Sequence, residues 1–226
     1  MLKASSFFTE EDRKLVEKAV AEAEEKTSGE IVPVVASKSG RYDRAEDVVG
    51  VVLGIVIVAL VWALFQEVRV VPGQWGEVYE LAVGLPLIAV LFAGGFVGGA
   101  LLATYFPLLA YPLIPKKELR EEVQQAARRA FFEHRVRGTK EGTGVLIYVS
   151  LFERMVVVLG DGAISAQLGR EDWEQIRDLV LQGLKEGKGA EGLARAIRRA
   201  GELLAKHFPI QSGDRNELPN TLHLID

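Results

Sequence analysis

VVGVVLGIVIVALVWALF, the segment from Val48 to Phe65, contains no Asp, Glu, Lys or Arg, and neither does the longer segment from Leu81 to Pro115. At roughly 1.5 Å of rise per residue, the 18 residues of the first segment just cross a hydrocarbon core of about 30 Å. The 35 residues of the second segment are too many for one untilted span, so we expect a crossing at about 82–105 and an irregular, proline-containing exit over 106–115. The two segments predict a membrane hairpin, and buried core helices or strands are the alternative.

The bulk composition disfavours several functions. The 226 residues, of which 49% are hydrophobic, suffice for the hairpin and one soluble domain of roughly 140 residues. The net charge of -4 is mixed along the chain, which disfavours nucleic acid as a partner. There is no Cys, and the three His have no ligand-like spacing, so we expect neither disulfides nor a zinc site. The first residues lack the apolar region of a secretory signal peptide.

The positive charges around the two spans predict the orientation of the hairpin. The Lys and Arg residues that flank its outer ends are Lys38, Arg41, Arg44, Lys116, Lys117, Arg120, Arg128 and Arg129. The loop between the spans offers only Arg69. Because positively charged segments stay on the cytoplasmic side, we expect an inner-membrane protein with both termini and the soluble domain in the cytoplasm.

The charged parts of the chain alternate between helical and strand patterns. Thr9 and Asp12 form the pattern of a capping box and predict a helix that ends near Thr27. The segment Glu30 to Ala36 is short, apolar and β-branched, which predicts a strand, and Pro33 suggests a sheet edge or a bulge. The further expected elements are a helix over 116–137, strands over 145–150 and 154–159, helices around 173–184 and 193–204, and an extended, partly mobile tail over 208–226.

These elements predict an α/β fold in which a small β-sheet is sandwiched by helices, with the two-span transmembrane helical hairpin as an insertion. Residues 1–47 and 116–207 are expected to form one domain, because the strand at 30–36 alone cannot bury both of its faces. Residues 48–115 are the insertion. The helical crossover between the strands at 30–36 and 145–150 predicts that these strands run parallel.

Four short motifs lie at the expected strand ends of the soluble part. They are Thr27 to Val32 (TSGEIV), Gly142 to Ile147 (GTGVLI), Glu153-Arg154, and Gly160-Asp161-Gly162. In these motifs the chain resembles the TPM-domain family, whose members include a chloroplast thylakoid repair factor and an acetylcholine-receptor accessory protein. The inserted hairpin and the tail motif Asn216 to Pro219 (NELP) are similar to a membrane-anchored bacterial branch of that family.

The resemblance implies a fold more than a chemistry. Members of the family have been associated with acid phosphatase activity, with calcium binding, or with the assembly and protection of membrane complexes. Where much of the family has an acidic residue after the glycine pair, this chain has Ala163-Ile164-Ser165. A carboxylate that would hold a metal is therefore missing, which weakens the expectation of an enzyme. Calcium stays the one cofactor that the resemblance implies.

Candidate site residues fall into two groups at opposite ends of the predicted sheet. Asp161, with Glu141, is a candidate for binding a ligand or calcium on the cytoplasmic side, although Asp and Gly are also ordinary turn residues. Arg41, Glu153 and Arg154 would lie on the membrane side, where they would meet membrane lipid or a partner protein. Glu153 and Arg154 are alternatively a local ion pair that fixes the hairpin turn.

Four glycines in the second span form two overlapping GxxxG patterns: Gly94, Gly95, Gly98 and Gly99. Such glycines let helices approach closely, either within the hairpin, which we favour, or between two chains of a homo-oligomer. Neither span holds an ionisable residue, which disfavours a transporter or a proton relay.

Three hypotheses for the function are compatible with these features. The first is a non-catalytic, membrane-anchored domain that binds, assembles or protects other membrane proteins. The second is a phosphatase with metal-dependent activity near the membrane face, for which the sequence shows no tight cluster of carboxylates. The third is a structural two-span protein that oligomerises through its glycines. We favour the first hypothesis.

Overall fold

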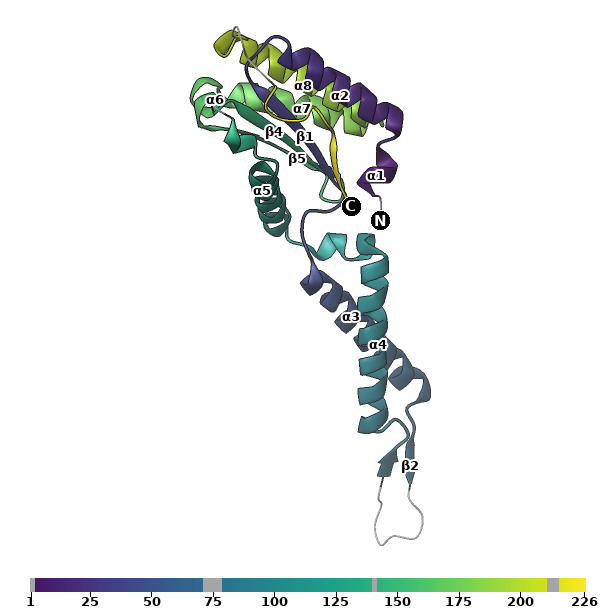
Figure 1. Cartoon of the computed structure of the whole chain (residues 1–226). Helices are drawn as coiled ribbons and strands as arrows, with labels where there is room; N and C mark the ends of the chain where they lie inside the picture. The colour runs from purple at the N-terminus through teal and green to yellow at the C-terminus, as the bar shows by residue number, and fades with distance from the viewer. Residues whose placement is uncertain (1–2, 71–78, 140–141, 211–215) are drawn as a thin grey trace. The chain divides into compact units, whose positions relative to one another are not determined.

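The structure, a computed structural model of the whole chain, describes residues 3–70, 79–139, 142–210 and 216–226 (Figure 1). These residues form two compact units. One unit combines the residues up to Gly40 with Lys117–Asp226, and the other runs from Arg41 to Lys116. The larger unit is therefore assembled from two segments that are distant in the sequence.

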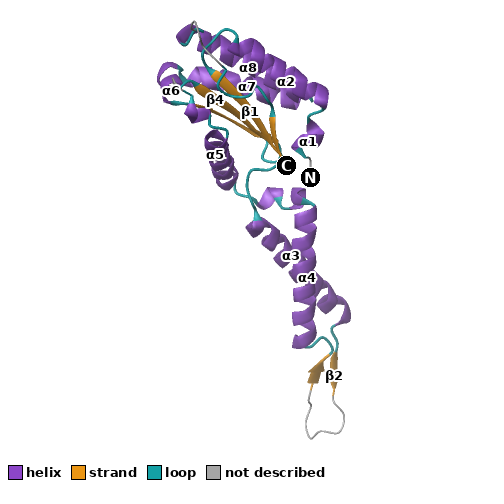
Figure 2. Ribbon diagram, in the orientation of Figure 1, coloured by secondary structure: helices purple, strands orange, loops and turns teal. Residues whose placement is uncertain are grey.

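A four-stranded mixed sheet forms the middle of the larger unit (Figure 2). Its strands are β1 (Glu30–Ala36), β4 (Gly144–Ser150), β5 (Met155–Gly160) and β6 (His223–Ile225), in the spatial order β5-β4-β1-β6. β1 runs parallel to β4 and to β6, and β5 is antiparallel to β4. The parallel pairing of β1 with β4 and the hairpin of β4 and β5 confirm the predictions.

β1 is an interior strand of the sheet, but at Pro33 it has a paired neighbour on the β4 side alone, so the predicted edge is found locally at this residue. β6 pairs with residues 34–36 and does not reach the level of Pro33. Backbone donors alternate between the two sides of a strand, and the Glu30 amide donates to Thr143, which precedes β4. The nitrogen of Pro33 therefore faces the β6 side, above the end of that short strand. A proline at this position removes no hydrogen bond from either ladder.

Helices cover both faces of the sheet, which gives the larger unit three layers (Figures 1 and 2). Three helices pack on one face: α2 (Glu10–Glu24), α7 (Arg170–Lys185) and α8 (Gly189–His207). α5 (Lys116–Glu133) packs on the other face. This is the α/β fold predicted from the sequence.

The side chains of β1 alternate between two hydrophobic cores. Ile31 and Val35 pack with α2 and α8, whereas Val32 and Val34 pack with α5. Every residue of β1 is buried, as is every residue of β4. The two central strands therefore need helices on both faces, which explains why the domain requires both halves of the chain.

The helix ends follow from the local sequence. The Thr9 hydroxyl accepts a hydrogen bond from the Asp12 amide, and the Asp12 carboxylate accepts one from the Thr9 amide, which confirms the predicted capping box. α5 ends at Glu133, before the predicted end, because Arg135 has a left-handed conformation (φ 55°) that leads into a 3₁₀ turn. The sequence pattern did not indicate two short helices, α1 (Ala4–Phe7) and α6 (Gly162–Gln167).

The C-terminal segment, which was expected to be an extended tail, ends in β6 beside β1. The Ser37 amide donates to the Ile225 carbonyl over 2.8 Å. Further back, the amides of Glu217 and Leu218 donate to the Glu30 carboxylate. A strand of three residues has too few positions for a periodic pattern, so the sequence gives no sign of it.

The second unit is a helical hairpin of α3 (Asp43–Phe65) and α4 (Leu85–Tyr105). Both helices are long and apolar enough to cross a membrane, by length and composition. α3 begins before the uncharged segment, and Asp43 and Glu46 lie in its first turn, where the helix dipole favours negative charge. The two helices therefore correspond to the two predicted spans.

Short elements connect the helices of the hairpin and follow it. β2 (Val68–Val70) and β3 (Tyr79–Leu81), which were not predicted, pair antiparallel between the two helices. After α4, two 3₁₀ turns over Pro107–Leu109 and Tyr111–Leu113 form the irregular exit that the prolines predicted.

Candidate functional site

A buried carboxylate, that of Glu153, organises the loops at the carboxyl end of β1. Glu153 lies in the turn between β4 and β5 and is 2% exposed. Its carboxylate accepts hydrogen bonds from the backbone amides of Ser39 (2.9 Å) and Gly40 (3.3 Å) and from the Ser150 hydroxyl. These donors compensate for burial of the charge and fix the course of the chain after β1. The sequence had suggested Arg154 as the partner of Glu153 and did not indicate these donors.

A chain of hydroxyl groups continues from this carboxylate. Ser150 Oγ lies 2.6 Å from Ser39 Oγ, which lies 3.0 Å from the hydroxyl oxygen of Tyr148. Ser150 donates its one hydroxyl hydrogen to Glu153, so Ser39 donates to Ser150, and Tyr148 donates to Ser39. Burial raises the pKa of Tyr148, so its hydroxyl stays protonated at neutral pH. The direction of the whole network is thereby fixed.

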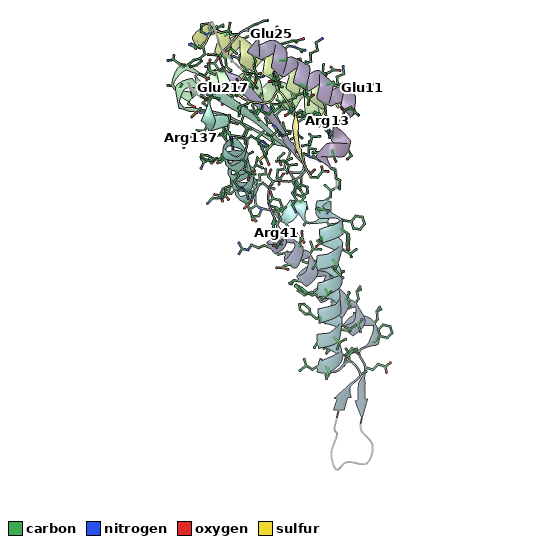
Figure 3. The ribbon with its side chains drawn as sticks, viewed as in Figure 1. Glu11, Arg13, Glu25, Arg41, Arg137 and Glu217 are labelled. Carbon is green, nitrogen blue, oxygen red and sulfur yellow. The ribbon has the colours of Figure 1, made fainter. Side chains whose placement is uncertain are left out.

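The two arginines predicted near Glu153 have different surroundings. Arg154 is exposed and has a left-handed backbone (φ 54°) in the tight turn between β4 and β5. Arg41 belongs to the hairpin unit, where its guanidinium lies 3.5 Å from the Asp43 carboxylate and its side chain is 89% exposed (Figure 3). Such an exposed ion pair contributes about 0–1 kcal/mol, so it holds Arg41 only weakly.

Asp161 has a structural role near the amino end of β4. It is the N-cap of α6, and its carboxylate accepts a hydrogen bond of 2.7 Å from the Gly162 amide. Gly142, which has a φ of +65°, lies so close that an added Cβ would be 3.5 Å from a carboxylate oxygen of Asp161. Glu141, the predicted partner of Asp161, lies outside the described residues. Within the described residues, no group of three or more His, Asp and Glu side chains could hold a metal ion.

Two further carboxylates, which are not among the predicted site residues, lie at the amino end of β1. The Glu30 carboxylate accepts the two amides of the C-terminal segment described above. Glu24 accepts the Ile31 amide at 3.0 Å, but its second carboxylate oxygen is buried and has no hydrogen-bond partner in the described part of the chain. Burial, aided by repulsion from Glu30, raises the pKa of Glu24 to about 8. A charged residue at the start of an otherwise apolar strand was the signal that could have indicated Glu30.

Two of the four predicted packing glycines lie between the helices of the hairpin. A Cβ on Gly95 would come within 2.7 Å of the Gly54 Cα, and one on Gly99 would come within 2.8 Å of the Gly50 Cα. The backbones of α3 and α4 therefore approach each other at positions where only glycine fits.

Gly94 and Gly98 lie on another face of α4. A Cβ added to either of them would meet no described atom within 4 Å. The pair Gly95 and Gly99 thus packs against α3, whereas the pair Gly94 and Gly98 packs against no described residue of another element.

Comparisons with known proteins agree with this architecture. The sequence profile of the TPM domain matches residues 114–203, which include α5, β4, β5 and α7. This segment therefore matches the TPM domain, in agreement with the resemblance of the chain to that family.

One solved structure has the same fold. The NMR structure of the BA42 protein from the psychrophilic bacterium Bizionia argentinensis is 23% identical in sequence, and the alignment covers 99% of each chain with a TM-score of 0.58. A comparison with curated proteins gives no match. The likeness to BA42 establishes the fold of the chain and leaves its function to be argued from its own residues.

Proposed function

We propose that this TPM-domain protein is anchored in the cytoplasmic membrane by α3 and α4, and that its domain binds other membrane proteins without catalysing a reaction. The observation that carries the proposal is the apolar surface of the hairpin. Large exposed side chains of this surface include Val52, Ile55, Leu60, Leu85, Val90 and Leu101. Exposure of such surface to water costs about 25 cal/mol of free energy per Å², and this cost is absent in the hydrocarbon core of a bilayer.

The lengths of the two helices support this anchor. α3 has 23 residues and α4 has 21, which at 1.5 Å per residue correspond to about 35 Å and about 32 Å. A typical hydrocarbon core is about 30 Å thick, so both helices match it with a modest tilt. Close packing at Gly95 and Gly99 joins the two helices by backbone contact, which stabilises helix pairs in lipid.

The charge distribution supports an orientation with the domain in the cytoplasm. The flanks of the spans carry eight Lys and Arg residues, and the loop between the spans carries Arg69. Positively charged flanks stay on the cytoplasmic side, so both termini would lie there.

The surroundings of the candidate carboxylates favour binding over hydrolysis. Asp161 caps α6, and Glu153 holds the loop after β1, so each carboxylate already has backbone donors. A hydrolase needs an activated nucleophile or a metal-bound water beside its substrate. These two side chains instead stabilise the ends of the sheet, which suits a rigid binding module.

Affinity purification from membranes tests this proposal. The tagged full chain, cross-linked in cells before solubilisation, should recover a reproducible set of membrane proteins. A chain truncated to the hairpin, residues 41–116, is the control and should not recover them.

Two results would overturn the proposal. Release of the full chain by washing membranes with alkaline carbonate would contradict the anchor. Metal-dependent hydrolysis of a generic phosphate ester by the full chain, lost in Asp161→Ala, would contradict the non-catalytic role.

A further inference from the structure

A small cavity of about 200 Å³ lies between α5 and the sheet, beside the loop that follows β1. Its polar lining consists of Lys38, Ser39, Arg129, Glu133 and Tyr148. α5 contributes two alanines at this level, which leave the space open. The loop after a parallel strand of an α/β sheet is a common position for ligands, because side chains from several elements converge there.

Two cationic groups line this cavity. Lys38 extends from the loop after β1, with its Nζ 5.4 Å from the centre of the Phe152 ring. Arg129 is exposed on α5 and takes part in no ion pair in the described part of the chain. A guanidinium and an ammonium together are the usual partners of a phosphate group, because both donate charge-assisted hydrogen bonds.

The other side chains of the cavity offer acceptors. The hydroxyl hydrogen of Tyr148 is donated to Ser39, so the Tyr148 oxygen presents only lone pairs to a ligand. Glu133, also on α5, adds a carboxylate, which has no ion-pair partner within the described residues. A simple anion would be repelled by this half of the cavity. A ligand that also carries a positively charged N–H donor would form hydrogen bonds with these two acceptors.

We propose that this cavity binds a phosphoethanolamine group, with the phosphate on Lys38 and Arg129 and the ammonium on Glu133 and the Tyr148 oxygen. This group exists free in solution and as the headgroup of phosphatidylethanolamine. Ser39 lies four residues before the start of α3, a chain length of at most about 14 Å. The lipid source rests on the proposed function, because it needs α3 in a bilayer, whereas the phosphoethanolamine site does not.

Titration of the full chain with soluble headgroups tests the site. The chain is labelled with 3-fluorotyrosine in a phosphate-free maltoside detergent, and the Tyr148 resonance is assigned with Tyr148→Phe. O-phosphoethanolamine should shift this resonance saturably. Phosphocholine, whose methylated nitrogen has no N–H donor, and inorganic phosphate should each bind about threefold more weakly or worse.

Three variants separate the parts of the site. Arg129→Ala should weaken phosphoethanolamine binding about tenfold. Arg128→Ala, the exposed neighbour on α5 that does not line the cavity, should leave binding unchanged. Glu133→Gln should retain phosphate binding but lose the preference for phosphoethanolamine over phosphocholine. All three residues are exposed, so these substitutions leave the core intact.

Lipid nanodiscs identify the source of the group. If replacement of phosphatidylcholine by phosphatidylethanolamine moves the Tyr148 resonance to its bound position, the headgroup is the ligand. If only the soluble compound moves it, the free compound is the ligand, and the site stands without the membrane anchor. Absence of a saturable shift with every probe, equal affinity for phosphocholine, or unchanged binding in Arg129→Ala would overturn the proposal.

Discussion

Gly95 of α4 lies directly against Gly54 of α3, so close that a Cβ on Gly95 would be 2.7 Å from the Gly54 Cα. Gly94, its neighbour in the sequence, has open space at the same position. Helix backbones that approach this closely gain dispersion contacts along their length, which is the main attraction between helices in lipid. The hairpin therefore depends on one glycine of this adjacent pair and not on the other.

The first prediction compares these two glycines. Thr104 near the end of α4 donates a hydrogen bond of 2.7 Å to Glu46 near the start of α3. Because the chain has no cysteine, a Glu46→Cys, Thr104→Cys double variant carries one pair of thiols, which a short bis-maleimide should cross-link within the hairpin. Adding Gly95→Leu should lower the cross-linking rate about threefold or more, since the larger side chain forces the helices apart.

Gly94→Leu is the matched control and should leave the cross-linking rate unchanged. If both leucine variants cross-link at the same rate as the parent, the packing of α3 on α4 does not depend on Gly95.

The sequence predicts the layers of this protein better than its site. Periodicity identifies α2, the central strands and the two apolar helices, because each has enough residues for a pattern. β6 and the network around Glu153 have no such pattern, since they join residues that are far apart in the sequence. The Gly-Asp-Gly motif around Asp161 predicted a ligand site, which stays a prediction, and it did not indicate that the carboxylate caps α6, a helix too short for a periodic pattern.

The second prediction concerns Glu24 and pH. Its pKa of about 8 in the folded protein lies above the usual 4.5, so the folded state favours the protonated carboxyl. The contribution of this group to stability is complete below pH 4.5 and is lost as the pH rises towards 8. Glu24→Gln, which stays neutral, should therefore raise the free energy of unfolding at pH 9 by about 1–3 kcal/mol and change little at pH 4.5.

Chemical denaturation of the full chain at the two pH values measures this difference. Glu25→Gln alters the exposed neighbouring carboxylate (Figure 3) and should have almost no effect. Destabilisation by Glu24→Gln at high pH would show that the Glu24 carboxylate is needed in its charged form.

The third prediction concerns two neighbouring histidines beside the last strand of the sheet. The rings of His134, after α5, and His223, the first residue of β6, have centroids 4.0 Å apart. Burial lowers the pKa of both, and His134 lowers that of His223 further. Their contribution to stability is thus complete above pH 6.5 and declines as the pH falls.

Hydrogen exchange at the Ser37 amide, which donates to Ile225 of β6, reports this docking. After correction for intrinsic exchange, protection should fall between pH 7 and pH 5 in the parent chain and stay constant in the double variant His134→Phe, His223→Phe, in which neither ring can take up a proton. His207→Phe, which alters an exposed histidine of α8, should behave like the parent chain. A pH dependence that survives in the double variant would mean that other groups release β6.

The fourth prediction is that the domain folds without the hairpin. Gly40 lies against Glu122 of α5, with 2.7 Å between an added Cβ and the Glu122 Cγ. Glu122 is six residues after the start of α5, about 9 Å along the helix, so a short Gly/Ser linker from Gly40 to Lys116 can close the gap. The shortened chain should be soluble and melt cooperatively by circular dichroism. A spectrum without helix and strand, or a gradual melt, would mean that the two segments of the domain need the hairpin to assemble.

Labelling of single cysteines tests the membrane anchor and its orientation most directly. Glu67→Cys lies between α3 and α4, Glu171→Cys lies in α7, and the parent chain has no cysteine of its own. In intact spheroplasts, a membrane-impermeant maleimide should label Glu67→Cys, and it should label Glu171→Cys only after the membrane is opened. Labelling of Glu171→Cys in intact spheroplasts while Glu67→Cys stays protected would invert the topology, and recovery of both variants in the soluble fraction would contradict the anchor itself.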